Sequence, residues 1–409
     1  MKRTVAVTGI GVVSPLGSDP QTLWENLING ISGIGTIEEL SGLPVTFGGR
    51  AASFDPALRF SPKEVRRMDR YTQMALSCGL DAYASAGLGS DAYPDRRIGV
   101  LMGTGAGGMA TIEEQIPLFH EKGPRRVSPL TVPMFIPNIA SAELAMKIGA
   151  RGPGMGLSSA CATGAHALAV AMRLVQAGDT DCMIAGGVEA CLTPFSVSAF
   201  ASMRALSTRN DDPARACRPF DRDRDGFVMS EGGAALVLEN LETARARGAQ
   251  VMAVLKGAGM SQDAYHLVAP DPEGKAVVYA MERALQDAGV PAEAIGYINA
   301  HGTSTPLNDK TETLAIRKVF GKRAYDVPVS STKSMTGHLI GGTASLETAI
   351  CILALTHGVL PPTINLDNPD PQCDLNYIPG RAIKADVAYC MNNAFAFGGQ
   401  NAVLIIGKE

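Results

Sequence analysis

Two distant stretches of this sequence share one unusual pattern, in which paired glycines lead into a run of apolar residues. Gly232-Gly233 comes directly before residues 234–238, and Gly398-Gly399 comes shortly before residues 402–406. A continuous apolar run of this length is typical of a strand that is buried on both faces. Because each run lies near the end of one part of the chain, the repetition indicates a duplicated unit.

A second pair of similar segments, 162–166 (ATGAH) and 335–339 (MTGHL), stands where a loop meets a helical pattern. The distance between the copies is far too long for a solenoid, whose repeats span about 20–50 residues. We therefore predict two topologically similar halves. The N-terminal half is expected over residues 1–250 and the C-terminal half over residues 251–409.

Short apolar runs alternate with helical patterns along the chain, and the runs lack period-two alternation. This organisation predicts an α/β protein whose strands are covered on both faces. The expected strands are residues 4–8, 98–102, 181–186, 234–238, 252–257, 294–299, 327–330, 389–393 and 402–406. The expected helices are residues 20–29, 71–86, 142–148, 162–176, 274–288, 309–320 and 345–356.

Composition excludes several classes of protein. The chain has 409 residues, 46% of them apolar, and its net charge of −4 gives no indication of nucleic-acid binding. We find no run of about eighteen apolar residues and expect neither a membrane-spanning helix nor membrane binding. The eight cysteines form no C-x-x-C pair. We therefore expect reduced, buried thiols, no metal site and a cytoplasmic location.

Cys161 is the candidate nucleophile, because a small-residue turn ends at this cysteine and an Ala-rich helical pattern follows it. At a helix N-terminus a thiol faces unpaired N–H groups and the positive end of the helix dipole, and both favour the thiolate. The alternative is a small buried side chain, which most free cysteines are. Taken alone, the segment 158–166 (SSACATGAH) leaves both interpretations open.

Two histidines follow expected strands and are surrounded by small residues. His301 lies in 299–306 (NAHGTSTP), and His338 lies in 330–338 (SSTKSMTGH). Ligands of α/β proteins bind at the carboxyl ends of strands, where we expect both side chains. Either histidine alone is more often a structural hydrogen-bonding group. Together with Cys161 they predict a catalytic site.

Two glycine-rich segments allow a close approach of backbone to a ligand. Residues 103–108 (GTGAGG) match the dinucleotide pattern G-x-G-x-x-G. No second strand ending in a ribose-binding acid follows about twenty residues later, so we do not expect a nicotinamide cofactor. Residues 393–401 (NAFAFGGQN) predict a loop whose N–H groups face a cavity, and the alternative is an ordinary hairpin turn.

The combination of these segments resembles the β-ketoacyl-acyl-carrier-protein synthases, and most closely the elongating synthase II type of bacterial fatty-acid synthesis. The resemblance extends over essentially the whole chain. It includes residues 12–17, 205–210, 224–227, 263–266 and 361–366. It implies the thiolase fold, in which two duplicated halves form α-β-α-β-α layers, and normally a homodimer.

The resemblance also implies roles for the site residues. Cys161 would accept an acyl group. Neutral His301 and His338 would donate hydrogen bonds to the malonyl thioester oxygen as this oxygen gains enolate charge. Lys333 would help to position His301, and Glu347 would support Lys333 by charge pairing.

Further implied roles concern the substrate. The N–H groups of Cys161 and Phe397 would form an oxyanion hole, with Phe397 also acting as a gate, and Thr303 and Thr305 would bind the pantetheine arm. The resemblance implies no redox cofactor and no catalytic metal, and it implies that the substrates are carried on the phosphopantetheine of acyl-carrier protein. Synthase II relatives typically have a larger aliphatic residue at the position of Ala106. We therefore predict a wider acyl pocket here, unless Ala106 faces packed core.

Acyl-carrier proteins are acidic, so an enzyme of net negative charge needs a local basic patch to attract one. The sequence contains two candidate docking clusters, each of which is otherwise an ordinary solvated face. The first cluster is Lys63, Arg66, Arg67 and Arg70, and the second is Lys122, Arg125 and Arg126.

Several other functions would use the same fold. A ketosynthase of a type II polyketide or polyene pathway would have the same Cys-His-His site, and could form a heterodimer with a chain-length-factor-like subunit. The presence of Cys161 argues against a chain-length factor and against a noncatalytic acyl-binding subunit. A thiolase fits less well, because the two histidine segments match ketosynthases better.

Overall fold

The computed structural model describes residues 2–89 and 91–409. Its centre is a ten-stranded sheet with the order β10-β9-β13-β14-β8-β1-β7-β6-β4-β5. The strands from the first part of the chain are β1 (Val5–Val13), β4 (Ile98–Gly103), β5 (Gly154–Leu157), β6 (Cys182–Glu189) and β7 (Gly232–Asn240). Those from the second part are β8 (Ala253–Gln262), β9 (Ile295–Asn299), β10 (Val329–Ser330), β13 (Tyr389–Phe395) and β14 (Gln400–Gly407).

The two sets of five strands follow the same order. Reading outward from the middle of the sheet, each set places its first strand innermost, followed by its fifth, fourth, second and third strands. β1 and β8 meet antiparallel at the junction, with Val7 opposite Ala253. Duplication of one α/β unit produces the same strand order in both sets, so the prediction of two similar halves is confirmed.

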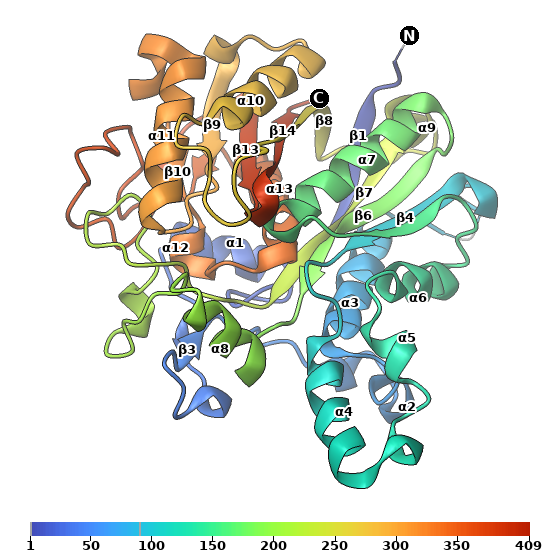
Figure 1. Cartoon of the computed structure of the whole chain (residues 1–409). Helices are drawn as coiled ribbons and strands as arrows, with labels where there is room; N and C mark the ends of the chain where they lie inside the picture. The colour runs from blue at the N-terminus through green and yellow to red at the C-terminus, as the bar shows by residue number, and fades with distance from the viewer. Residues whose placement is uncertain (1, 90) are drawn as a thin grey trace.

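Helices cover the sheet in layers (Figure 1). α3 (Arg70–Ser85) and α6 (Ile139–Ile148) pack on strands of the N-terminal half, whereas α10 (Lys275–Ala288) packs on β8 and β14 and contacts α11 (Pro306–Phe320). α7 (Thr163–Ala177) and α13 (Thr343–His357) contact each other and strands of both halves. They form the central layer, which gives the five-layered α-β-α-β-α arrangement that the resemblance implied.

The remaining elements lie at the periphery or in connections. The helices are α1 (Pro20–Ile28), α2 (Pro62–Val65), α4 (Met109–Lys122), α5 (Thr131–Phe135), α8 (Pro194–Ser202), α9 (Leu241–Ala246) and α12 (Lys333–Thr336). Two small ribbons pair β2 (Gly35–Thr36) with β3 (Phe47–Gly48), and β11 (Val359–Leu360) with β12 (Ile383–Lys384).

α7 and α13 are counterparts in the two halves. Each has 15 residues and starts at a threonine, Thr163 or Thr343. A turn of 3-10 helix precedes each one, η5 (Ala160–Ala162) before α7 and η9 (Ile340–Gly342) before α13. The first residue of each turn is left-handed although it is not glycine, with φ of 46° and 44°. Cys161 and Gly341 therefore occupy equivalent positions.

This correspondence corrects the second repeat predicted from the sequence. Residues 162–166 begin α7, whereas residues 335–339 end α12 and form the turn before η9, so the two segments are not equivalent. The two sequences resemble each other because both contain a Thr-Gly dipeptide. The two central helices approach each other closely at Gly164, where an added Cβ would lie 2.6 Å from the backbone nitrogen of Ser345.

One expected helix, residues 345–356, belongs to a longer apolar segment. By length and composition, residues Ile340–His357 could cross a membrane, although the stretch is not a continuous apolar run. In the structure 89% of this stretch is buried inside the protein, where it forms η9 and α13 of the central layer. Its hydropathy is therefore explained by contacts with sheet strands on both sides.

Candidate active site

Cys161 lies in a tight turn between β5 and α7. The left-handed backbone of Ala160 directs the chain into η5, and Ser159 accepts the N–H of Ala162 at 3.1 Å. The hydroxyl of Thr163 closes the turn by accepting the N–H of Ser159 at 2.8 Å and donating to the carbonyl of Ala160 at 2.7 Å. These bonds fix the thiol at the N-terminal end of α7, as the sequence predicted.

The environment of the Cys161 thiol does not favour the thiolate overall. Only 7% of the residue is exposed, and burial raises the pKa of the thiol to about 11. The N–H of Phe397, the Lys333 cation and the N–H of Cys161 itself act in the opposite direction but are weaker. Desolvation by burial therefore acts against the thiolate more strongly than these groups favour it.

This balance predicts a pH dependence for the reactivity of Cys161. Because the thiolate is the reactive species, its alkylation by iodoacetamide should accelerate about tenfold per pH unit between about pH 7 and pH 10. Peptide mass spectrometry at Cys161 gives the rate. A plateau below about pH 8 would show instead that the site stabilises the thiolate.

His301 follows the end of β9 and is fixed through its backbone. Glu312 on α11 accepts the N–H of His301 and the N–H of Gly302, both at 2.8 Å. Its carboxylate also accepts the side-chain amide of Asn393 at 2.9 Å. The ring nitrogen Nδ1 of His301 is buried without a hydrogen-bond partner among the described residues. No motif marks Glu312 in the sequence, because its role depends on the path of α11.

His338 is held by both halves of the chain. Its N–H donates to the carbonyl of Val228 at 2.7 Å, and its carbonyl accepts the N–H of Ser230 at 2.9 Å. Nδ1 of its ring pairs with the hydroxyl of Thr343 at 2.8 Å, which leaves Nε2 buried without a partner among the described residues. If Thr343 donates, Nε2 carries the proton and can donate it to a substrate oxygen.

The two rings lie edge to face, with centroids 5.6 Å apart. Burial lowers the pKa of His301 well below its ordinary value, and the nearby Lys333 and His338 lower it further. Burial and Lys333 likewise lower the pKa of His338. Both imidazoles are therefore neutral at neutral pH, which is the state in which each can donate one hydrogen bond.

Lys333 and Glu347 form a buried ion pair behind the histidines. Nζ of Lys333 donates to Oε1 of Glu347 at 2.6 Å, and both side chains are at most 1% exposed. Burial raises the pKa of Glu347 to about 7, against the opposing effect of the Lys333 cation. In the part of the chain that the structure describes, no hydrogen bond joins Lys333 to His301. Lys333 acts on His301 through its charge here.

A cavity of 390 Å³ brings the predicted substrate groups together. Cys161, His301 and His338 line it, with Phe395 and Phe397 from β13 and the following glycine-rich turn. Thr303 and Thr305 also line the cavity, and their hydroxyl oxygens are 2.9 Å apart. The structure thus joins one thiol, two neutral imidazoles and two hydroxyl groups in one space.

The glycine-rich turn after β4 surrounds a buried carboxylate of this chain. Glu189 accepts the N–H groups of Gly105 at 2.7 Å, Ala106 at 3.2 Å and Gly341 at 3.1 Å. It also accepts the hydroxyl of Thr104 at 2.8 Å. These donors are already hydrogen-bonded within the protein, so they are not available to a nucleotide phosphate.

Ala106 is exposed and is not among the residues that line the cavity. It therefore does not face packed core in the single chain. Its place at the wall of an acyl pocket stays a prediction from the resemblance.

The two docking clusters are exposed, with one exception. Lys63, Arg66, Arg67, Lys122, Arg125 and Arg126 are all exposed near α2 and at the end of α4, toward the bottom of Figure 1. Arg70 instead donates from Nε to the buried carboxylate of Glu231 at 2.8 Å. Arg70 is therefore a structural residue, and we no longer count it in the first docking cluster.

The chain belongs to the β-ketoacyl synthase family. Family models match both parts of it: the N-terminal domain of β-ketoacyl synthase over residues 2–244 and the C-terminal domain over residues 252–367. With this membership the two-half architecture described above is the thiolase fold, and the chain is an enzyme of the acyltransferase class.

Similar proteins indicate which type of β-ketoacyl synthase the chain resembles. It is 48% identical to 3-oxoacyl-[acyl-carrier-protein] synthase 2 of Synechocystis sp., over 100% of this chain and 98% of the relative. A type II polyketide ketosynthase, solved with its acyl-carrier protein, matches with a TM-score of 0.94 and 33% identity over 100% of both chains. A chain of the ishigamide ketosynthase/chain length factor structure gives the same TM-score, identity and coverage.

Proposed function

We propose that this protein elongates a fatty acyl chain by two carbons through a decarboxylative Claisen condensation with malonyl-acyl-carrier protein. The single observation that carries the proposal is the cavity in which Cys161 meets two neutral histidines. The full-length similarity to synthase 2 enzymes supports the fatty-acyl substrate. The proposed chemistry needs no redox cofactor and no metal ion, and we expect it to take place in the cytoplasm.

In the first half-reaction, the sulfur of Cys161 attacks the carbonyl carbon of an acyl thioester. The bond to the pantetheine sulfur breaks, and that sulfur leaves as a thiol with the proton that Cys161 loses. The N–H groups of Cys161 and Phe397 both approach the thiol sulfur. They would stabilise the tetrahedral oxyanion, because fixed donors in a dry site need no reorganisation.

In the second half-reaction, the malonyl carboxylate leaves as carbon dioxide, and its bonding electron pair becomes that of an enolate. His301 and His338 donate hydrogen bonds to the enolate oxygen, which a neutral imidazole can do without becoming charged. The enolate carbon then attacks the acyl carbonyl, and Cys161 leaves as the thiolate. Thr303 and Thr305 hold the pantetheine arm during this step.

The test of the proposal is a complete reaction with purified components. Wild-type protein, an acyl-carrier protein loaded with a short acyl group and malonyl-acyl-carrier protein should give a 3-ketoacyl product two carbons longer, with release of carbon dioxide. Intact-mass spectrometry of the carrier protein detects the product. Carbon dioxide release without an elongated product would contradict the proposal.

For docking we propose that the acidic carrier protein binds the cluster of Lys63, Arg66 and Arg67, with Lys122, Arg125 and Arg126 as a second contact. Charge reversal at Arg66 and Arg67 should raise KM for carrier-bound substrates, and the increase should shrink at high salt. Short acyl-pantetheine substrates lack the acidic protein, so their KM should stay nearly constant. Steady-state kinetics at two salt concentrations measures both effects.

The control for docking is charge reversal at two exposed cations elsewhere, Arg381 and Lys384 near β12. This variant changes the net charge equally and should leave KM for carrier-bound substrates unchanged. If charge reversal at Arg66 and Arg67 lowers the activity equally with carrier-bound and pantetheine substrates, the variant has a folding defect. This result would reject the docking surface.

A second candidate function is that of a ketosynthase in a type II polyketide or polyene pathway. The similarity to a type II ketosynthase in complex with its carrier protein favours it. In that case the protein could pair with a chain-length-factor-like subunit, whereas the fatty-acid function favours a homodimer. Repeated condensation without reduction, seen as products several ketide units longer, would distinguish the polyketide function.

A further inference from the structure

A loop of the N-terminal half, residues 215–226, crosses onto the turn of the C-terminal half that carries His301, Thr303 and Thr305. Two of its bonds converge on Ser304, in the middle of that turn. The N–H of Arg218 donates to the Ser304 hydroxyl at 2.9 Å, and the N–H of Gly226 donates to its carbonyl at 3.1 Å.

Ser304 needs this support because its backbone is left-handed, with φ of 69°. Serine adopts that region at a cost, and such residues persist only where surrounding bonds fix them. The unusual conformation determines how the residues on either side of Ser304 are presented. The hydroxyl groups of Thr303 and Thr305 consequently lie side by side at the cavity wall.

Arg224 of the same loop binds the end of the turn. Its guanidinium donates to the carbonyls of Thr305 and Pro306, each at 3.1 Å. It also donates to the carboxylate of Asp370 at 2.7 Å and lies 3.6 Å from that of Asp309. The side chain is only 4% exposed. A buried guanidinium with several fixed acceptors has very little freedom to move.

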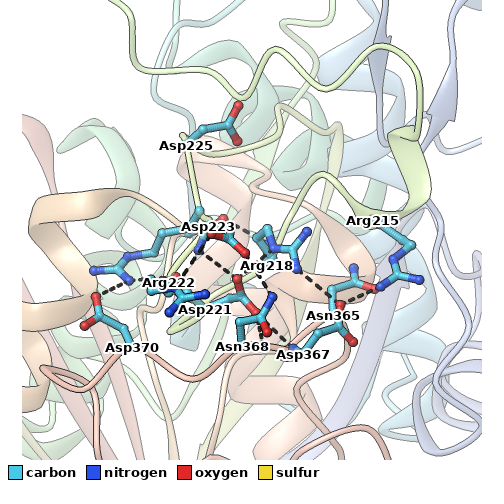
Figure 2. Close-up of polar contacts among 12 residues, drawn as sticks. Arg215, Arg218, Asp221, Arg222, Asp223, Asp225, Asn365, Asp367, Asn368 and Asp370 are labelled. Atoms are coloured by element: carbon cyan, nitrogen blue, oxygen red, sulfur yellow. Dashed lines mark hydrogen bonds and ion pairs between the residues drawn. The ribbon is translucent and has the colours of Figure 1, made fainter.

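Asp221 anchors the loop itself. Its buried carboxylate accepts the N–H groups of Asp367 at 2.9 Å and Asn368 at 2.7 Å, and Nε of Arg218 at 3.1 Å (Figure 2). It also accepts the N–H of Asp223 at 2.8 Å. The loop is thus bound to the C-terminal half both at the segment around residue 367 and at the turn around Ser304.

From these contacts we infer that Arg224 is a positioning residue, which sets the pantetheine-binding hydroxyls of Thr303 and Thr305 by holding the end of their turn. This inference rests on the proposed function. Arg224 does not line the cavity, so it acts on substrate binding only through the turn. Loss of its donors should therefore weaken binding of the pantetheine arm more than it affects the Cys161 thiol.

The test compares Arg224→Gln, Arg224→Lys and the wild type in two reactions at Cys161. In the first, butyryl-pantetheine acylates the thiol, and the concentration that gives half the maximal rate should rise at least about tenfold in Arg224→Gln. Arg224→Lys keeps one charged donor and should recover part of this loss. In the second, iodoacetamide alkylates the same thiol without a pantetheine arm, and its rate should stay within about twofold of the wild type.

Arg222 provides the matched control, because its side chain is 66% exposed on the same loop. Arg222→Gln should behave as the wild type in both reactions. If Arg224→Gln does not fold, Ser304→Gly replaces it: glycine tolerates the left-handed backbone but lacks the hydroxyl that accepts from Arg218. This variant should show the same separation of the two reactions, by a smaller factor.

Two results would overturn the inference. One is an unchanged half-saturating concentration in the Arg224→Gln or Ser304→Gly variant, and the other is an equal loss of acylation and alkylation. A different result would overturn the proposed function and everything that rests on it. This result is a wild-type protein that is acylated neither by butyryl-pantetheine nor by acyl-loaded acyl-carrier protein.

Discussion

Replacement of Cys161 by alanine should abolish formation of the acyl-enzyme and with it all elongation. Cys161 is the only cysteine that lines the described cavity, and its sulfur faces the N–H groups of Cys161 and Phe397. Incubation with acyl-carrier protein that is loaded with an acyl group should add one acyl mass to the wild-type protein and none to the variant. Intact-mass spectrometry makes this measurement directly.

The control for this prediction is Cys191→Ala. Cys191 is also buried but does not line the cavity, so its replacement should leave the acyl adduct in place. An acyl adduct that persists in Cys161→Ala would mean that another side chain accepts the acyl group, and the assignment of the nucleophile would be wrong.

Replacement of His338 by alanine should separate the two half-reactions. Acyl transfer to Cys161 should continue, because the oxyanion donors of that step are backbone N–H groups. Condensation should fall by about a hundredfold or more, since one fixed donor to the developing enolate is lost. Single-turnover acylation and steady-state elongation, measured on the same preparation, give the two rates.

His357→Ala is the matched control for that variant. His357 is exposed at the end of α13, where its ring stacks on Trp24 with centroids 5.1 Å apart. Its replacement should change neither half-reaction. Near-normal elongation by His338→Ala would show that His338 is structural, and an equal loss of acylation would show that the variant disturbs Cys161 itself.

Much of the fold was predictable from hydrophobic patterns. Strands such as β4 and β13 and the helices α3 and α10 lie within a few residues of their expected bounds, because burial on both faces leaves a strong apolar signal. β5 was missed: two of its four residues are glycine and it forms an exposed edge of the sheet. α4 was also missed, because Pro117 interrupts its pattern and little of the helix is buried.

For the site, the sequence predicted which residues carry chemistry but not what holds them. Cys161 and the two histidines stand in short, distinctive segments, so their identity is local information. The supports of His301 and His338 are not local. Glu312 and Thr343 belong to the helices that follow, and the backbone around Val228 belongs to the other half. Only the tertiary arrangement brings these groups to the histidines.

The net pKa of Cys161 was unpredictable for a similar physical reason. The sequence indicates a helix start, whose N–H groups favour the thiolate, but it does not measure how completely water is excluded. Desolvation depends on how closely the cavity walls surround the thiol, and two of the lining residues, Phe395 and Phe397, come from the far end of the chain. The sign of the shift was therefore decided by long-range packing.

The pairing of Cys161 with Gly341 explains why a duplicated molecule contains a single reaction centre. Both residues follow a left-handed residue at the head of a central helix, so the ancestral turn exists twice. A Cβ at Gly341 would lie 2.5 Å from the nitrogen of Gly105 and 2.9 Å from Glu189, so a second thiol has no room there. Under the proposed function the turn at Cys161 accepts the acyl group, whereas the turn at Gly341 joins the two halves through its N–H and Glu189. In the proposed reaction the growing chain is therefore bound covalently at one residue, and the second copy of the turn offers no residue to which it could be transferred.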